Sequence, residues 1–513
     1  MEELPYLKTI VKGAGLVLIG TIISKFLSFV YRIFIARYFG VEEYGIFSMA
    51  LALLSFFMII VLLGLPQGIT RYVSYYKSKG SEAKVKGTIL DSFKLSLIVS
   101  VILAFLLFLI SDTIAFYLFH DTTGKITTLI RIMSLSLPFF SLFMLSTSAS
   151  VGFKKIEHRV YTEYISQNLL KLVFTVFFGL IGLGVFGIGL AWTLAIILTS
   201  FLSLYLLNKT FPLIKKTIKS HPMKKELLHF SMPLLFAGFL GTIVSYTDTV
   251  MLGFFTTPKE VGIYNAALPI AQLLMVPSAL LSSLLLPVLS EMYAKKKTLA
   301  IKKIYKTITR WSFYLSFPLL VTILFFSQQI LIVTFGEIYI KGSTALIILS
   351  MGFFLNFTLI HVVNVMSLMK KTTKVLHLSI VAAFTNFLLN LFLIPVWNIE
   401  GAATASFTSY LIIFILSLIW INKNLHMFPL EFAYVKSILA GCFAGFSIFF
   451  IKDIFYLNFF FAIVLSLLLL IIYVFILLFF KSFLKEDIEI ILSIEKRTGI
   501  NLERIKKLLR KII

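Results

Sequence analysis

Long apolar stretches alternate with short polar ones along the whole chain, and this alternation dominates the hydropathy pattern. A membrane-spanning helix needs roughly 20 mostly apolar residues. Fourteen stretches meet this requirement, at residues 11–36, 44–69, 88–110, 127–150, 159–180, 184–207, 228–254, 261–290, 306–326, 343–368, 374–394, 399–421, 433–451 and 456–480. The pattern therefore predicts an all-α, polytopic membrane protein with about 14 transmembrane helices.

The chain also repeats itself at an offset of 217 residues, where segment 43–47 aligns with 260–264. The register continues without a gap through Ala50 with Ala267, Met58 with Met275, Tyr76 with Tyr293 and Lys86 with Lys303. Chance similarity between apolar sequences is the competing explanation, but charges and glycines match as well as leucines. We therefore predict two pseudo-symmetric six-helix bundles, a common plan for transporters that rock around a central site.

The repeat and the polar stretches predict five segments along the chain. They are an N-terminal bundle at 1–207, a cytoplasmic linker at 208–227, a C-terminal bundle at 228–421, two additional transmembrane helices at 433–480 and a tail at 481–513. The tail mixes apolar residues at mostly helical spacing with many lysines and arginines. This pattern fits a basic amphipathic helix on an anionic membrane surface, or a solvated helix packed on cytoplasmic loops.

The charge of the chain is placed as a bilayer would require. Of 513 residues, 59% are hydrophobic and 14% charged, and the formal net charge is +24. Alternate loops hold 36 of the 47 lysines and arginines, the other loops hold 5, and the remaining 6 lie within or at the ends of the stretches. Positive residues prefer cytoplasmic loops, so both termini are predicted in the cytoplasm, and a nucleic-acid partner is not expected. The one cysteine, Cys442, excludes an intramolecular disulfide and a cysteine-based metal cluster.

Several cations lie inside the apolar stretches of the N-terminal half, where burial costs at least roughly 2.5–3.5 kcal/mol on insertion scales. Lys25 and Arg32 share one helical face with other polar residues, and a second polar face runs along stretch 159–180. If these faces converge, they line a positive cavity suited to a phosphate or pyrophosphate headgroup. The candidate cavity residues are Lys25, Arg32, Gln167, Asn168, Lys171 and Arg131. Arg131 has an alternative role, because it lies near the end of its stretch and can extend to the interface.

The C-terminal half is polar but carries fewer buried charges. Asp248 is a candidate partner for Arg32 across the two-fold axis, or a site for a coupling cation or a proton. Asn265, Gln272 and Asn364 are secondary candidates, although amides within bundles often only join helices. No cofactor and no resident metal is expected, apart from Na⁺ or H⁺ coupling.

The motifs of several enzyme classes are absent from the sequence. There is no G-x-x-x-x-G-K-[ST] phosphate loop, no H-E-x-x-H and no G-x-S-x-G motif. No polar region exceeds about 35 residues, too few for a soluble catalytic domain. A transporter is therefore expected, and a membrane-embedded glycosyltransferase or ligase is the enzymatic alternative.

Five segments together resemble a known family. These are Phe34–Gly45, Asp248–Gly253, Val261–Ala267, Leu286–Ser290 and Gly401–Ala405. Each motif is loose, but their order resembles that of the polysaccharide exporters of the multidrug/oligosaccharidyl-lipid/polysaccharide (MATE-like) superfamily. The resemblance covers essentially the whole chain and agrees with fourteen helices.

The resemblance implies an oligosaccharide flippase of the cell membrane. Such a protein moves a polyprenyl-phosphate- or pyrophosphate-linked oligosaccharide from the inner to the outer leaflet by alternating access, for cell-surface polysaccharide or glycan biosynthesis. The implied partners are the lipid-linked oligosaccharide, membrane lipid and other polysaccharide-assembly proteins. A cation-coupled multidrug extruder of the same superfamily is the alternative, but it usually has twelve helices and cavity acids. A non-transporting scaffold of a surface-assembly complex is a third hypothesis.

Overall fold

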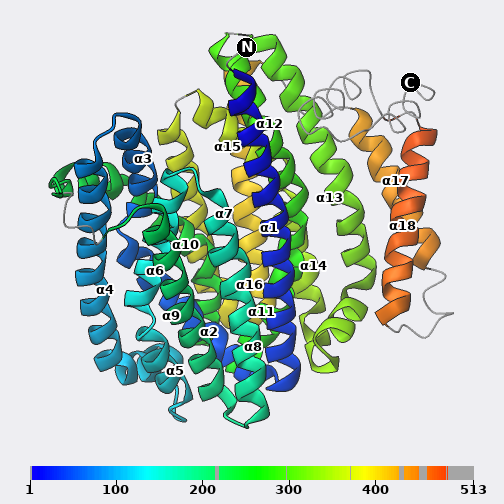
Figure 1. Cartoon of the computed structure of the whole chain (residues 1–513). Coiled ribbons are helices and arrows are strands. Elements are labelled where there is room, and N and C mark those ends of the chain that lie inside the picture. Colours follow the sequence, from blue (N-terminus) through cyan, green and yellow to red (C-terminus); the bar gives the residue numbers. More distant parts are fainter. Residues whose placement is uncertain are drawn as a thin grey trace. The chain divides into compact units, whose positions relative to one another are not determined.

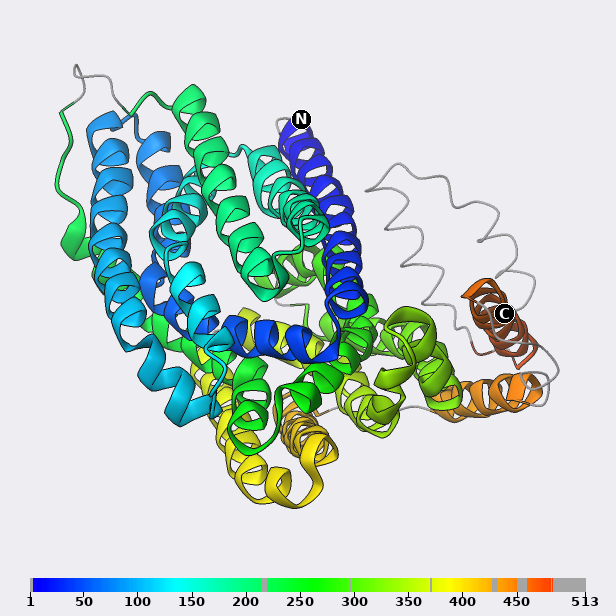
Figure 2. The same cartoon turned by 90° about the horizontal axis from the view of Figure 1, so that it is seen from below.

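The computed structural model describes residues 3–213, 219–295, 297–369, 371–426, 432–449, 459–480 and 482. Every regular element in these ranges is helical, as Figures 1 and 2 show from two directions. The prediction of an all-α fold is therefore confirmed. The predicted basic tail at 481–513 lies outside the described residues, except for Ser482.

Packing divides the chain into two compact units. The first, called here the N-terminal unit, comprises residues 12–265 and 390–399, and the second, the C-terminal unit, comprises 1–11, 266–389 and 400–513. The predicted bundles were instead divided at the linker 208–227. The difference arises because helix α10 (Lys224–Phe255) packs against α2, α3 and α4. Its Gly238 permits this approach, since a Cβ there would lie 2.9 Å from the Ile59 side chain. The two-bundle division remains a prediction about the repeat.

The helices of the N-terminal unit begin with α1, most of which belongs to it. They are α1 (Glu3–Tyr38), α2 (Val41–Leu62), α3 (Leu65–Ser78), α4 (Glu82–Phe119), α5 (Lys125–Ser134), α6 (Leu137–Gly152), α7 (Ile156–Arg159), the π-helix η1 (Val160–Ser166), α8 (Gln167–Leu180), α9 (Gly184–Thr210) and α10. The next helix, α11 (Pro258–Gln272), begins in this unit and continues into the C-terminal one.

The remaining helices belong mainly to the C-terminal unit. They are the 3₁₀-helix η2 (Leu273–Met275), α12 (Val276–Ala294), α13 (Thr298–Thr334), the 3₁₀-helix η3 (Glu337–Gly342), α14 (Ser343–Phe354), α15 (Asn356–Leu368), α16 (Thr372–Leu425), α17 (Phe432–Phe449) and α18 (Phe459–Phe479). His361 of α15 is bridged by two serine hydroxyls, from Ser282 of α12 at 2.9 Å and Ser312 of α13 at 2.7 Å. This histidine joins three helices, the packing role usual for a satisfied buried imidazole.

Nine helical segments among the described residues are long and apolar enough to cross a membrane, or ten if the bent pair α5 and α6 is one span. The other predicted stretches also lie on helices. Stretch 159–180 falls on α7, η1 and α8, α16 contains two stretches on either side of a kink at Asn398, and the last two stretches fall on α17 and α18. The count of fourteen is consistent with this structure and remains a prediction.

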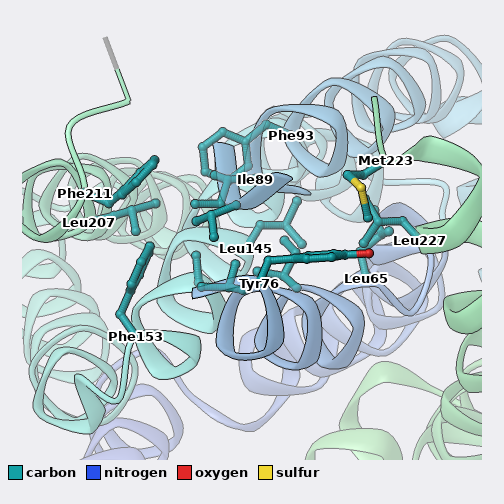
Figure 3. Close-up of a cluster of buried hydrophobic side chains, with 14 residues drawn as sticks. Leu65, Tyr76, Ile89, Phe93, Leu145, Phe153, Leu207, Phe211, Met223 and Leu227 are labelled. Atoms are coloured by element: carbon teal, nitrogen blue, oxygen red, sulfur yellow. The ribbon is translucent and has the colours of Figure 1, made fainter. Parts of the chain in front are cut away.

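A cluster of buried apolar side chains fixes helix α3 against its neighbours (Figure 3). Leu65, Ile69, Val73 and Tyr76 recur at helical spacing on one face of α3. They meet apolar residues of α4, α6, α9 and α10, among them Ile89, Leu145, Leu207 and Leu227. Leu63 and Gly64 precede α3 with φ values of 49° and 66°, so the helix is interrupted between α2 and α3. The packed face of α3 leaves its polar face turned to the other side.

The described part of the predicted linker is docked on α4. The backbone N–H of His221 donates to the Ala83 carbonyl at 3.0 Å, and that of Met223 donates to the Asp91 carboxylate at 2.7 Å. Gly87 permits the contact, because a Cβ there would lie 1.7 Å from the His221 carbonyl oxygen. The segment before α10 is therefore held by the N-terminal unit.

Candidate functional site

The repeat becomes visible in the N-terminal unit where α2 meets the start of α11. Gly45 and Gly262 are equivalent in the repeat, and each faces the backbone beside the other. A Cβ on Gly45 would lie 1.7 Å from the Pro258 carbonyl oxygen, and one on Gly262 would lie 2.1 Å from that of Val41. Val41 and Pro258 are themselves 217 residues apart. Reciprocal contacts of this kind are the signature of a two-fold axis, so a local pseudo-two-fold passes between the two glycines.

Side chains next to this crossing obey the same symmetry. Ser48 donates to the Tyr44 carbonyl at 2.8 Å, and Asn265, its repeat equivalent, donates to the Val261 carbonyl at 3.0 Å. A second equivalent pair has changed its chemistry. Tyr31 and Phe47 meet edge to face with centroids 6.0 Å apart, whereas Asp248 and Tyr264 form a hydrogen bond. The duplicated contact is thus apolar in one copy and polar in the other.

The buried Asp248 carboxylate lies within a hydrogen-bond network of the N-terminal unit. The Tyr264 hydroxyl donates to its Oδ2 at 2.5 Å, and the Asn390 amide donates to its Oδ1 at 2.7 Å. Asp248 is 6% exposed. The Arg32 guanidinium lies 3.3 Å from the Tyr44 hydroxyl. The cross-bundle pair of Arg32 with Asp248 and a coupling role for Asp248 both stay predictions.

The Tyr44 hydroxyl connects Arg32 to the start of α11. It donates to the Asn265 carbonyl at 2.9 Å, and the Thr249 hydroxyl lies 3.3 Å from the Asn265 side-chain oxygen. Arg32 is partly exposed, whereas Asn265 is buried. The two helices that carry Asp248 and Arg32 are thus linked through amide and hydroxyl groups.

The polar face of α8 packs against α1, whereas the predicted convergence of the two polar faces into a cavity stays a prediction. Asn168 donates to the Ser24 hydroxyl at 3.0 Å, and the Lys171 ammonium lies over the rings of Tyr31 and Trp192, at 5.7 and 4.8 Å. Lys171 is only 7% exposed, so its charge is stabilised by aromatic faces. Lys25 is exposed on α1, and Gln167 is partly exposed on α8.

Three other candidates lie elsewhere. Arg131 of α5 contacts α4, where it pairs with Asp112, donates to the Ser111 hydroxyl at 2.9 Å and lies 5.5 Å from the Phe108 ring centroid. Gln272 ends α11 and Asn364 lies on α15, both partly exposed and both in the C-terminal unit. The structure thus gives Arg131 partners on α4, while its cavity role and its interfacial alternative both stay predictions.

A polar cavity of about 570 Å³ lies within the N-terminal unit. Its walls come from α2, α3, α6, α7, η1 and α10. The polar lining residues are Gln67, Thr70, Arg71, Thr147, Ser148, Arg159 and Glu163. Gln67, Thr70 and Arg71 stand on the face of α3 opposite the apolar cluster of Figure 3. Amphipathic packing of α3 therefore turns its polar face into the cavity.

Two guanidinium groups and one carboxylate set the charge of this cavity. The Arg159 Nε donates to Glu163 at 2.7 Å, and a second guanidinium nitrogen donates at 3.3 Å, in a two-point pair along one helix face. The Arg71 guanidinium lies over the Phe230 ring, 4.4 Å from its centroid. Thr70 donates to the Pro66 and Ser148 carbonyls, each at 3.0 Å. The lining thus combines an excess of positive charge with hydroxyl and amide groups, a composition suited to a phosphorylated, hydroxyl-rich ligand.

In the sequence, Arg71 and Arg159 belong to the loop charges that indicate orientation, and neither is a predicted site residue. Two features of the sequence nevertheless indicate a role for these arginines in a site. The spacing of apolar residues in 65–76 leaves Arg71 on the polar face of a helix, and Arg159 and Glu163 are an i, i+4 pair of opposite charge. The sequence did not predict that Val160–Ser166 forms a π-helix, an element frequent at functional sites.

Comparison with known proteins gives the family. The profile described as "Polysaccharide biosynthesis protein" matches residues 10–293, and the MatE profile matches 233–392. The uncharacterized membrane protein MJ1068 of Methanocaldococcus jannaschii is 26% identical over 471 residues, 88% of this chain and 91% of that protein. The probable low-salt glycan biosynthesis flippase Agl15 of Haloferax volcanii is 25% identical over 186 residues, 36% of this chain and 39% of that protein.

Solved structures show the same fold. The lipid II flippase MurJ in an inward closed conformation has a TM-score of 0.70 at 17% identity, over 90% of this chain and 98% of that one. An inward-facing multidrug resistance MATE family transporter has a TM-score of 0.68 at 14% identity, over 79% and 94%. These matches are to transporters and flippases, and the first profile covers more than half of the chain. The chain accordingly belongs to the polysaccharide biosynthesis protein family, within the MATE-like superfamily of multi-pass membrane transporters.

Proposed function

We propose that this protein flips a polyprenyl-phosphate- or pyrophosphate-linked oligosaccharide from the inner to the outer leaflet of the cell membrane. The observation that carries the proposal is the polar cavity of an otherwise apolar bundle, lined by the exposed Arg71 and the partly exposed Arg159. A phosphate needs fixed cations in place of its lost hydration, and sugars need hydroxyl and amide partners. The lining supplies both kinds of group.

The basic loops indicate on which side of the membrane this cavity lies. Arg71 lies within α3 and Arg159 ends α7, and in the sequence both belong to the lysine- and arginine-rich set of predicted loops, at 71–86 and 154–159. Those loops are the predicted cytoplasmic ones. In this proposal the cavity receives the headgroup on the inner side, where a lipid-linked precursor is assembled, and both termini lie in the cytoplasm.

Two features of the N-terminal unit would help the headgroup to bind and to be released. Glu163 already pairs with Arg159, so an incoming phosphate competes with an internal carboxylate and is held less tightly than by two unpaired arginines. The Gly45–Gly262 crossing supplies a close contact between repeat-equivalent helices, about which the halves would rock for alternating access. Lys25 and Arg32 remain proposed as a second cationic surface along the route.

The test is leaflet exchange of a fluorescent polyprenyl-pyrophosphate oligosaccharide in liposomes. A charge-assisted hydrogen bond contributes about 1.5–3 kcal/mol, so Arg71→Gln with Arg159→Gln is expected to slow exchange by about tenfold or more. Lys79→Gln with Lys209→Gln is the matched control, since it removes two exposed charges that do not line the cavity. Equal rates for both double variants would dismiss the cavity as the headgroup site.

Two further measurements test the cationic surface formed by Lys25 and Arg32 and the alternative function of a drug extruder. Lys25→Ala and Arg32→Ala would slow exchange if their face also guides the headgroup. A cation-coupled extruder is favoured by the MatE match over 233–392 and by the buried Asp248. No exchange with any carrier, together with Na⁺- or H⁺-driven efflux of a cationic dye that is lost in Asp248→Asn, would establish that function instead.

A further inference from the structure

A second basic recess lies in the C-terminal unit, and its lining includes none of the candidate site residues named above. It has a volume of about 440 Å³ and lies between α15 and the two arms of α16. Its lining residues include Lys374, His377, Trp420, Lys423 and Asn424. The rest of the lining is aliphatic or thioether, from residues such as Leu378, Val381 and Leu416. One end of the recess is therefore cationic, and its walls are apolar.

The kink of α16 creates this recess. Asn398 has φ 48° and ψ −123°, and Pro395 lies just before it. The helix folds back there, and the Asn386 amide donates to the Ser406 hydroxyl at 3.2 Å between the two arms. Lys374 and Lys423 stand near the start and the end of α16. Antiparallel pairing of the arms therefore brings both ammonium groups to the same end of the hairpin.

The described part of the structure gives the two lysines no counter-charge. Among the residues that the structure describes, no carboxylate lies within ion-pairing distance of either ammonium, and both side chains are exposed. Trp420 is partly buried beside them and packs on a core that includes Val365, Met366 and Ile421. Tryptophan with an apolar body and a polar edge is enriched at the membrane–water boundary. The adjoining Ile419 is 58% exposed, as expected for a surface that faces acyl chains.

We propose that this recess binds an anionic phospholipid of the inner leaflet. Its phosphate would lie between Lys374 and Lys423, with His377 and Asn424 beside it. Its acyl chains would lie along Leu378, Val381 and Leu416. Basic pockets between transmembrane helices on the cytoplasmic side are known to bind anionic headgroups, and the loops that carry both lysines belong to the basic set. This proposal concerns a lipid that stays bound and does not depend on the transported substrate.

Quenching of Trp420 fluorescence by brominated lipid tests the proposal directly. The full chain would be placed in nanodiscs that contain brominated phosphatidylglycerol or brominated phosphatidylcholine, and the signal of Trp420 obtained by subtracting that of Trp420→Phe. We expect phosphatidylglycerol to be preferred at Trp420, with the preference reduced about fivefold for each lysine removed. Lys374→Gln with Lys423→Gln should therefore abolish it. Native mass spectrometry of retained phosphatidylglycerol gives the same comparison if the Trp420 variant does not fold.

The matched control is Lys224→Gln with Lys225→Gln, which removes two exposed charges from the N-terminal unit. This variant should keep the preference for phosphatidylglycerol. Equal quenching by the two lipids, or equal loss in both double variants, would overturn the proposal. Sodium phosphate that relieves quenching more than sodium chloride of equal ionic strength would identify a site for free anions instead.

Discussion

Gly45→Ala is expected to destabilise the protein by about 3 kcal/mol, at the upper end of the usual cost of overpacking. The added Cβ would lie 1.7 Å from the Pro258 carbonyl oxygen and 2.9 Å from the Gly262 nitrogen. Both are backbone atoms at the start of α11, so no side chain can rotate away and the helices must separate. Thermal unfolding in detergent, followed by intrinsic fluorescence, would show the loss.

The repeat supplies a second test of the same close contact, at Gly262. Gly262→Ala should cost a similar amount, because its Cβ would lie 2.1 Å from the Val41 carbonyl oxygen in the equivalent contact. Gly241→Ala is the control, since nothing lies within 4 Å of a Cβ there. In a helix interior this change is expected to be neutral or to stabilise by up to about 1 kcal/mol. Wild-type stability of both Gly45→Ala and Gly262→Ala would refute the close backbone crossing.

Asp248→Ala is expected to lower stability by about 3 kcal/mol, because two buried donors lose an acceptor. The Tyr264 hydroxyl and the Asn390 amide both donate to this carboxylate. A hydrogen bond to a charged group contributes about 1.5–3 kcal/mol, and an unsatisfied buried partner adds its desolvation cost. The same unfolding measurement applies.

A double-mutant cycle separates this network from a transport role. Asp248→Asn and Tyr264→Phe each disturb one side of the 2.5 Å contact, and we expect a coupling energy of about 2 kcal/mol between them. Phe47→Leu serves as the control, since the equivalent position in the first repeat carries no such bond. Strict additivity would contradict the network. Stability that is unchanged in Asp248→Asn, with ion-coupled transport lost, would assign Asp248 to coupling.

Helical spacing predicts which residues share a face of a helix, but it does not predict the residues that this face contacts. Lys171 and Asn168 lie on one face of α8, as their spacing predicts, and both contact α1. Their partners were not predictable, because Trp192 and Ser24 are distant in sequence. The same holds for Arg32 and Asp248, whose partners Tyr44 and Asn390 come from other helices.

The sequence by itself determined the membrane character, the helical class, the duplication and the family, since these follow from properties summed over many residues. Hydropathy needs only local composition, and the 217-residue repeat needs only alignment. The tertiary structure alone decided which polar groups share a cavity. Arg71 and Arg159 line the same cavity because α3 buries its apolar face and a π-helical segment follows α7. Such convergence depends on long-range packing and helix rotation, and a change of a few ångströms decides whether two charges meet.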